Sequence, residues 1–181
     1  MNLANKITLF RVVLIPIFMF FLLTDVSNGQ YIAAVIFIIA SLTDTLDGYI
    51  ARSRNQVTNF GKFMDPLADK LLVSAALISL VEMSKVPAWM VIVIIAREFA
   101  ITGLRVIAAS EGITIAASKL GKIKTITQLV AVIAILFNNY PFKLINFPFD
   151  RIMLYLAVFF TILSGVDYIY KNKKVLHSGE R

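Results

Sequence analysis

The chain has 181 residues, of which 59% are hydrophobic and only 16% are charged, and its mean hydropathy is +0.80. A soluble domain is closer to half apolar with about 25% charge, so this composition excludes an ordinary soluble domain. The chain has no cysteine, and its single histidine, His177, lies in the polar tail. Thiol nucleophiles, disulfides, thiolate zinc sites and a buried imidazole base are therefore excluded.

Six apolar runs follow one another along the chain, and each approaches the roughly 20 residues needed to cross a bilayer. They predict an all-α integral membrane protein with six transmembrane helices, near residues 7–24, 30–51, 66–84, 87–109, 120–139 and 149–170. These helices use nearly the whole chain, so we expect one membrane-embedded domain over residues 1–181. The first run also resembles a signal peptide, but its length and the five later runs favour a retained helix.

The basic residues that give the net charge of +7 are unevenly distributed. They gather at the N-terminus, in residues 52–62 and 105–124, and in the tail 171–181, whereas the other connections carry only Lys85, Lys143 and Arg151. By the positive-inside rule, both termini face the cytoplasm. Nucleic-acid binding is the alternative for a basic chain, but these charges flank helix ends, where lipid headgroups or a phosphate substrate would bind. We therefore expect no nucleic-acid partner.

The second predicted helix ends in a group of acidic and small residues. On a helix, Asp44 and Asp47 share one face with Gly48 and Ala51, because the spacing is 0, 3, 4 and 7. Small residues on that face allow a bulky ligand to approach the backbone closely. The face is therefore suited to binding a ligand beside two carboxylates.

The third predicted helix begins with a second acidic pair. Asp65 and Asp69 are four positions apart and share a face, with Gly61 one turn earlier. Pro66 is expected in the first turn of this helix, where its missing N–H costs nothing. Two adjacent helices thus present four carboxylates near their cytoplasmic ends.

Four clustered carboxylates indicate a divalent metal site, because Mg²⁺ and Mn²⁺ prefer hard oxygen ligands. Unpaired acidic residues inside a membrane span cost free energy, so an acid found there is interpreted as part of a functional site. The alternative without a metal is a set of interfacial salt bridges between these acids and Arg52, Arg54, Lys62 and Lys70. Salt bridges do not explain why both acidic pairs are spaced so that each pair shares one helix face. A divalent-cation transporter is the rival outside enzymes, but a transport site is expected near the midplane, not beside a basic patch.

The residues from Asp44 to Asp69 follow the pattern D-x2-D-G-x2-A-R-x8-G-x3-D-x3-D. This pattern is similar at every fixed position to the signature of the CDP-alcohol phosphotransferases, and the six-helix, N-in arrangement resembles that family over essentially the whole chain. The resemblance implies an enzyme that uses Mg²⁺ or Mn²⁺, with two ions. An alcohol would attack the β-phosphorus of a CDP-linked lipid and release CMP.

The resemblance also implies roles for individual residues. Asp44, Asp47, Asp65 and Asp69 resemble the metal ligands, and Asp69 also resembles the general base that takes the proton of the acceptor hydroxyl. The positions that resemble those packed around the CDP-lipid are Gly48, Ala51 and Gly61, with Arg52 near the diphosphate.

The N-terminal segment is polar where the first helix begins. Asn5 and Thr8 resemble nucleotide-contacting residues at the N-terminus of one branch of the family. The alternative is an ordinary interfacial helix start, in which Lys6 and Arg11 extend to lipid headgroups. Both interpretations remain open at this point.

The fourth predicted helix carries charges inside an apolar span. At 100° per residue, Glu98 and Arg105 share a face, and Arg97 borders it. A structural pair between Arg97 and Glu98 is the simple interpretation. One positive charge is then left over, which suits an anionic ligand such as a phosphate-bearing acceptor.

The fifth predicted helix begins with three lysines. Lys119 and Lys122 lie about 60° apart on a helix, whereas Lys124 points to the opposite side. We assign Lys122, with Lys119 as a further candidate, to the acceptor phosphate, and we expect Lys124 to extend into lipid. The alternative for all three is the general excess of cytoplasmic cations.

The stretches around Arg97–Arg105 and Lys119–Gln128 resemble the branch of the family that joins CDP-diacylglycerol to sn-glycerol 3-phosphate. The alternatives within the family are phosphatidylglycerol, inositol phosphate or serine as the acceptor. The resemblance also implies a homodimer. We expect a multi-pass protein of the cell (plasma) membrane, in contact with membrane lipids and with its active site on the cytoplasmic side.

Three further groups of residues have structural assignments. Trp89 and the tyrosines near helix ends are assigned to lipid-facing packing and the interfacial belt. Gly103 and Gly165 are expected to permit close helix contacts. Residues 138–150 read as an outer loop at the membrane interface.

Overall fold

The computed structural model of the protein describes residues 3–53, 59–110, 112–113, 115–116 and 118–173. Residues 3–4, 44–53, 59–63, 65 and 66 are described by their backbone alone. The described part of the chain forms six α-helices and one 3-10 helix without any strand, which confirms the predicted all-α class. The helices are α1 (Leu3–Leu23), α2 (Gly29–Ser53), α3 (Asn59–Glu82), α4 (Ala88–Ser110), α5 (Lys119–Leu136), η1 (Phe142–Ile145) and α6 (Phe149–Lys171).

The predicted helix bounds agree with the observed ones within four residues, except at the start of the third helix. α3 begins at Asn59 and not near residue 66, so Pro66 lies inside the helix and the prediction that it occupies the first turn was wrong. The prediction placed the start where the apolar run begins. A helix is defined by its backbone hydrogen bonds, so it can continue through polar residues beyond an apolar span. Gly61, Asp65 and Asp69 consequently lie on one continuous helix.

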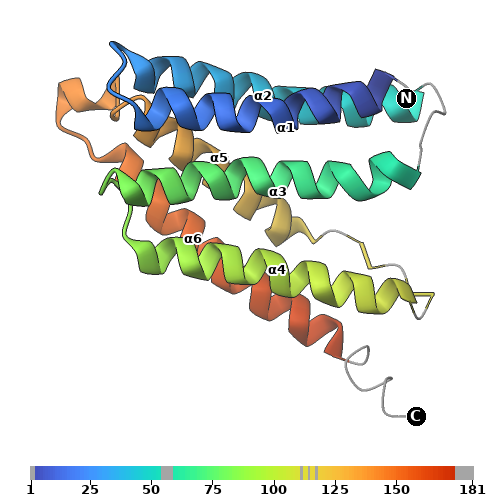
Figure 1. Ribbon diagram of the computed structural model, residues 1–181. Helices are drawn as coiled ribbons and strands as arrows, with labels where there is room; N and C mark the ends of the chain where they lie inside the picture. Colours follow the sequence, from blue (N-terminus) through green and yellow to red (C-terminus); the bar gives the residue numbers. More distant parts are fainter. Residues whose placement is uncertain (1–2, 54–58, 111, 114, 117, 174–181) are drawn as a thin grey trace. The chain divides into compact units, whose positions relative to one another are not determined.

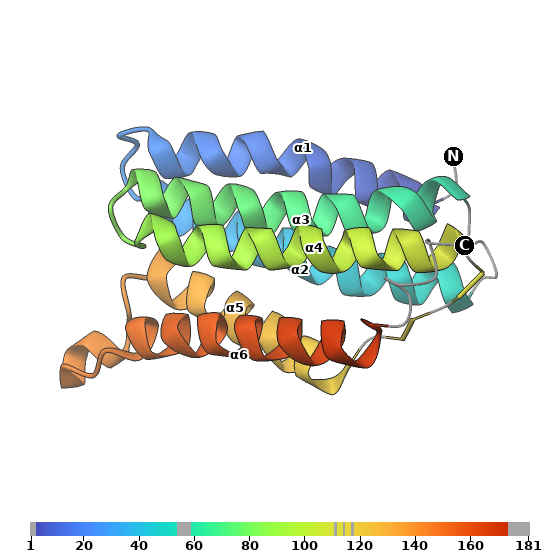
Figure 2. The same cartoon turned by 90° about the horizontal axis from the view of Figure 1, so that it is seen from below.

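The chain divides into two compact units. The first consists of Met1–Val86 and Ile133–Tyr140, and in it α1, α2 and α3 pack against one another (Figures 1 and 2). Its core includes the fully buried rings of Phe18 and Phe37, whose centroids are 5.9 Å apart. Leu72 of α3 is also buried in this core. These contacts hold the two helices that carry the four aspartates.

A tight connection joins α1 to α2. Asn28 has a left-handed backbone conformation with φ of 58°, which asparagine tolerates better than most residues. A Cβ on the next residue, Gly29, would collide with the backbone carbonyl of Phe21. Glycine is therefore required where α2 begins.

A polar clamp closes the other end of the first unit. Gln30 donates from Nε2 to the carbonyls of Ile135 (3.2 Å) and Leu136 (2.6 Å) at the end of α5. Lys85, between α3 and α4, donates to Oε1 of Gln30 (2.6 Å) and to Oδ1 of Asn138 (2.7 Å). Burial lowers the pKa of Lys85. The last carbonyls of a helix lack partners within the helix, and this clamp supplies them.

Replacement of the clamp glutamine is expected to destabilise the protein. Gln30→Leu leaves the Leu136 carbonyl without a partner among the described residues and removes one of the two acceptors of Lys85, a loss of about 1–3 kcal/mol. The measurement is the midpoint of thermal unfolding in detergent. Thr24→Val is the control, because the exposed Thr24 hydroxyl donates to the Phe20 carbonyl and water can replace this bond. Equal midpoints for the two variants would contradict a stabilising role for the clamp.

The second unit consists of Pro87–Val132 and Pro141–Arg181. In it, α4 packs against α6, and the two helices cross in Figure 1. The contact is built on a cluster of buried side chains, Ile101, Leu104, Ala108 and Tyr168. The connection from α5 to α6 contains the short helix η1, and its location outside the membrane stays a prediction.

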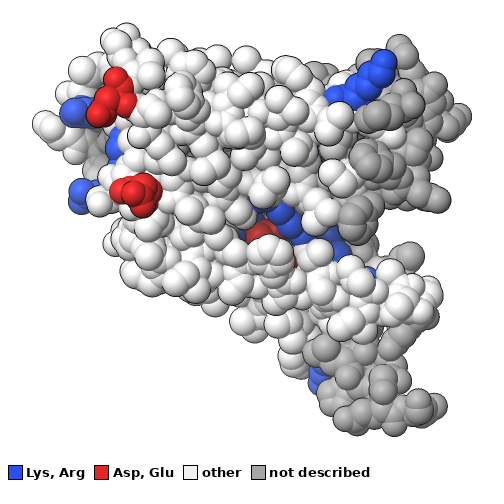
Figure 3. All heavy atoms as spheres, viewed as in Figure 1, with Lys and Arg blue, Asp and Glu red and all other residues white. Residues whose placement is uncertain are grey.

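Several features indicate a membrane protein. Among the described residues, two helices are long and apolar enough to cross a membrane, Asn5–Leu23 and Phe149–Lys171, and Gly29–Thr43 is a shorter apolar helix. Only 28% and 39% of the two longer stretches are buried inside the protein. Most of their apolar surface therefore faces outward, unlike the core helix of a soluble protein. The face shown in Figure 3 is correspondingly mostly uncharged.

Candidate active site

The four aspartates lie on two helices that contact each other. α2 carries Asp44 and Asp47, and α3 carries Asp65 and Asp69. The backbone is helical at all four positions, so each acidic pair lies on one face of its helix, as the residue spacing predicts. The side chains of the first three lie outside the described residues, whereas that of Asp69 is half-buried and has an interaction partner.

The donor set on these helices fits a hard divalent cation. Carboxylate oxygens are the ligands that Mg²⁺ and Mn²⁺ prefer, and two contacting helices can supply four of them. The positions expected around the CDP-lipid lie on the same two helices, with side chains outside the described residues: Gly48, Ala51, Arg52 and Gly61. Their roles stay predictions.

The polar start of α1 faces the interior of the first unit. The exposed fractions of Asn5, Thr8 and Arg11 are 6%, 1% and 0%. All three have interaction partners. The interpretation that Arg11 extends to lipid headgroups was wrong, because a side chain three positions from Thr8 shares its inward face. Lys6 is exposed, as expected.

Arg97 of α4 is held by two side chains of the second unit. Its Nη1 donates to Oε1 of Glu98 (3.3 Å), and its Nη2 donates to Oγ of Ser164 on α6 (3.1 Å). A Cβ on Gly165 would lie 3.2 Å from Cγ of Arg97. The predicted close approach at Gly165 is therefore confirmed, whereas no described atom lies within 4 Å of a Cβ on Gly103.

Lys124 of α5 binds the same glutamate. Its Nζ forms an ion pair with Oε1 of Glu98, and its exposed fraction is only 3%. The prediction that Lys124 extends into lipid was wrong, because the side of α5 opposite Lys122 faces protein. Glu98 is thus shared by two cations, Arg97 and Lys124. The second unit contains more buried positive charge than the residues of α4 alone suggest.

Removal of the shared acid is expected to destabilise the protein strongly. Glu98→Gln removes the carboxylate that Arg97 and Lys124 share, and breaking a buried pair in this way costs about 3–5 kcal/mol. The measurement is the thermal unfolding midpoint, with Glu82→Gln as control because Glu82 is exposed. The double variant with Lys124→Met is expected to recover part of the loss. A Glu98→Gln midpoint equal to the control would contradict this account.

Arg105, two turns after Arg97, has a different environment. It is exposed, and its Nε donates to the hydroxyl of Tyr168 on α6 (2.9 Å). The guanidinium carbon lies 5.4 Å from the centroid of the same ring. Tyr168 has an exposed fraction of 2%, so its assignment to the lipid-facing aromatic belt was wrong. Trp89 agrees with that assignment, because it is 55% exposed.

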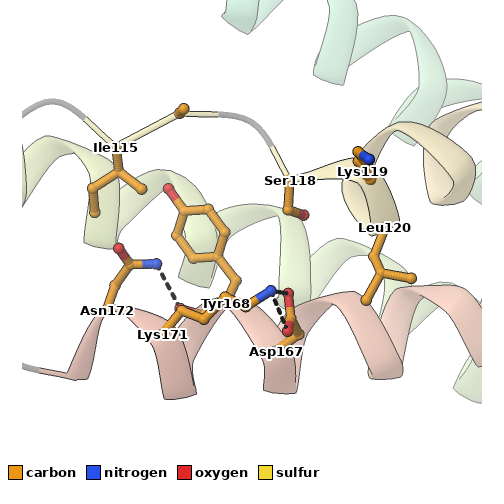
Figure 4. A pocket seen from close by; sticks show the side chains of 9 residues that line it. Ile115, Ser118, Lys119, Leu120, Asp167, Tyr168, Lys171 and Asn172 are labelled. Atoms are coloured by element: carbon orange, nitrogen blue, oxygen red, sulfur yellow. Dashed lines mark hydrogen bonds and ion pairs between the residues drawn. The ribbon is translucent and has the colours of Figure 1, made fainter.

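A pocket of about 350 Å³ lies where α5 begins and α6 ends. The side chains that line it come from both helices and from the segment before α5 (Figure 4). Among them are Ser118 and the exposed Lys119. Lys171 forms an ion pair with Asp167 (2.8 Å) on the same wall. Lys122 is also exposed at the start of α5, so both predicted phosphate-binding lysines are accessible.

Sequence reasoning missed the residues of α6. Ser164 and Tyr168 hold the two arginines of α4, and Asp167 lines the pocket. Hydropathy marks α6 as a span without showing which side faces protein. The only signal in the sequence was that two arginines in a span need partners.

Comparison with known proteins gives a consistent result. The sequence profile described as CDP-alcohol phosphatidyltransferase matches residues 1–163. A protein of Bacillus subtilis named CDP-diacylglycerol–glycerol-3-phosphate 3-phosphatidyltransferase is 56% identical over 97% of each chain. A protein of the same name from Rickettsia felis is 36% identical over 96% of each chain. A Mycobacterium tuberculosis protein named probable phosphatidylglycerophosphate synthase is 37% identical over 93% of this chain and 80% of its own.

The matched region contains α1 to α5, most of α6 and all eight fixed positions of the aspartate signature. The family predicted from that signature is thereby confirmed. The chain belongs to the CDP-alcohol phosphatidyltransferase family.

Proposed function

We propose that this protein transfers the phosphatidyl group of CDP-diacylglycerol to sn-glycerol 3-phosphate, which forms phosphatidylglycerol phosphate and CMP. The observation that carries the proposal is the 56% identity, over 97% of both chains, to the Bacillus subtilis protein named for this reaction. The eight-position signature on α2 and α3 agrees with it.

In the proposed reaction, one bond to phosphorus forms and one breaks. The acceptor hydroxyl oxygen bonds to the phosphorus of the lipid phosphate, and the bond from that phosphorus to the bridging oxygen of CMP breaks. CMP leaves with the bonding electron pair. The carboxylate of Asp69 takes the hydroxyl proton. Asp69 suits this role because it is half-buried on α3, one turn after Asp65, and a base must be positioned as well as basic.

We infer that Asp44, Asp47, Asp65 and Asp69 hold Mg²⁺ or Mn²⁺, with two ions in the site. When bound, the ions stabilise negative charge on the attacking and leaving oxygens of a phosphoryl displacement. The chain's own contribution is to carry four acids on two contacting helices. Gly48, Ala51, Arg52 and Gly61 would contact the CDP-lipid, together with Asn5 and Thr8, which lie buried on α1.

The acceptor phosphate is proposed to bind the cations of the second unit, Arg97, Arg105, Lys119 and Lys122. Lys119 and Lys122 are exposed, and Arg105 has only its Nε bonded to a described residue. Arg97 has a partner on each Nη, so it contributes charge with less freedom to reorient. Four cations in one unit favour an acceptor that carries a negative charge, such as a phosphate, over serine.

We further propose a multi-pass protein of the plasma membrane with six transmembrane helices, both termini in the cytoplasm and the active site on the cytoplasmic side. Support comes from the six α-helices of 18 to 25 residues in the described part of the chain. The basic N-terminus and tail support the orientation, because positive residues favour the cytoplasmic side. A homodimer is proposed from the family resemblance alone.

The proposal is tested by supplying the purified protein with CDP-diacylglycerol and one acceptor at a time. The acceptors are glycerol 3-phosphate, phosphatidylglycerol, inositol phosphate and serine, and the measurement is the rate of CMP release. We expect glycerol 3-phosphate to give the highest rate by at least about tenfold, which is about 1.4 kcal/mol of discrimination. Equal rates with all acceptors, or release that needs no acceptor, would contradict the proposal.

A further inference from the structure

Two helices of the second unit join at Arg105 and Tyr168. The Nε of Arg105 donates to the Tyr168 hydroxyl over 2.9 Å, and the guanidinium carbon lies 5.4 Å from the ring centroid. This bond uses Nε and none of the four N–H groups on the two Nη nitrogens. No described residue accepts a hydrogen bond from those nitrogens, so a fork suited to a phosphate remains available.

Tyr168 is itself fixed in place. Its exposed fraction is 2%, and it packs in the cluster formed by Ile101, Leu104 and Ala108 of α4. The backbone carbonyl of Tyr168 accepts a hydrogen bond from the side chain of Asn172 (2.7 Å), which ties down the end of α6. The buried ring therefore holds the hydroxyl oxygen in one position. An arginine side chain has about 2 kcal/mol of rotamer entropy, so a fixed acceptor restricts it considerably.

The surroundings of Tyr168 suit an anionic ligand. Figure 4 shows its ring rising from α6 toward the segment that precedes α5, at the pocket that also contains Ser118 and Lys119. Lys119 is exposed, and the only acid that lines this pocket, Asp167, is already paired with Lys171 among the described residues. A second cation is thus available beside the residue that holds Arg105.

We propose that Tyr168 is a positioning residue, which holds the guanidinium of Arg105 so that its two Nη nitrogens face the phosphate of the acceptor. The inference rests on the proposed function, because it takes Arg105 as a ligand of that phosphate. Tyr168 touches no reacting atom. It acts by restricting Arg105 before the acceptor binds, which lowers the entropic cost of binding.

The test compares Tyr168→Phe, Arg105→Gln and the double variant in steady-state assays of CMP release. Tyr168→Phe keeps the packed ring and removes only the hydroxyl. We expect it to raise KM for glycerol 3-phosphate about five- to tenfold, the effect of one hydrogen bond, and to leave kcat and the KM for CDP-diacylglycerol within about twofold. Arg105→Gln is expected to raise the same KM further. In the double variant, loss of the hydroxyl should add nothing, because its partner is gone.

Tyr155→Phe is the matched control, since it removes the same atom from the same helix at a residue that is 61% exposed. Its KM should equal that of the unaltered protein. Arg105→Lys is the second variant, which leaves Tyr168 intact and replaces the fork by a point charge. It should raise the KM for glycerol 3-phosphate at least as much as Tyr168→Phe does.

The possible results distinguish a failure of the positioning role from a failure of the proposed function. An increase in KM with Arg105→Gln but not with Tyr168→Phe overturns the positioning role alone. Unchanged KM with both Arg105 variants overturns the assignment of Arg105 to the acceptor phosphate, and the inference with it. Absence of CMP release with glycerol 3-phosphate in the unaltered protein overturns the proposed function itself. A lowered kcat and melting temperature with unchanged KM would show a merely structural tyrosine.

Discussion

Chelation of divalent metal is expected to abolish CMP release by the purified protein. The four aspartates of α2 and α3 would lose the ions that stabilise the attacking and leaving oxygens, a contribution of several kcal/mol. Since each 1.36 kcal/mol corresponds to a factor of ten in rate, the fall should be at least about a thousandfold. The measurement is the initial rate after dialysis against EDTA, and addition of Mg²⁺ or Mn²⁺ in excess should restore it.

Metal binding can also be measured without turnover. Mg²⁺ or Mn²⁺ should raise the thermal unfolding midpoint of the unaltered protein, because a ligand that binds only the folded state stabilises it. The increase should shrink in Asp44→Asn and Asp65→Asn and persist in Asp25→Asn, since Asp25 is exposed in the connection between α1 and α2. Activity that survives EDTA, with no metal-dependent shift, would contradict a metal site on these helices.

Asp69→Asn is expected to lower kcat by about 10²–10⁴-fold, the usual contribution of a positioned general base. The amide has nearly the shape of the carboxylate but cannot take the acceptor proton. The measurement is kcat for CMP release at saturating glycerol 3-phosphate, with Asp25→Asn as control. Activity within about tenfold of the unaltered protein would rule out Asp69 as the base.

A metal titration distinguishes a base from a ligand. A variant that has lost only a metal ligand binds the ion more weakly, so excess Mn²⁺ should recover part of the activity of Asp44→Asn. The same excess should leave Asp69→Asn inactive, because no added ion replaces the missing proton acceptor. Equal recovery of both variants would show that Asp69 serves as a ligand alone.

The fold could be predicted largely from apolar runs, because each run of about 20 residues has few alternatives to a helix. The start of α3 could not, since Asn59–Asp65 mix Asn, Gly, Lys and Asp with two Phe and one Met, so they form no apolar run although they continue the helix. Hydropathy marks the apolar part of a helix and says little about polar turns at its ends. This difference matters because Gly61 and Asp65 lie in those turns.

The aspartate pattern was the most informative part of the site, because metal ligation requires particular residues at fixed spacing on particular helices. The environments of Lys124 and Tyr168 could not be predicted. The partner of Lys124 is Glu98, 26 positions away, and the partner of Tyr168 is Arg105, 63 positions away. Periodicity along one helix cannot identify the neighbouring helix, so a lysine or tyrosine near a helix end was assigned to the membrane interface by default.

The central claim is tested most directly by the identity of the lipid product. The purified protein is supplied with CDP-diacylglycerol and carbon-13-labelled glycerol 3-phosphate, and the extracted lipids are analysed by mass spectrometry. Transfer of the phosphatidyl group predicts a labelled phosphatidylglycerol phosphate, formed in equal amount to CMP and at a rate about 10²–10⁴-fold lower when Asp69→Asn replaces the unaltered protein. CMP release accompanied by phosphatidic acid, with all of the label left in the aqueous phase, would show that water and not glycerol 3-phosphate is the acceptor.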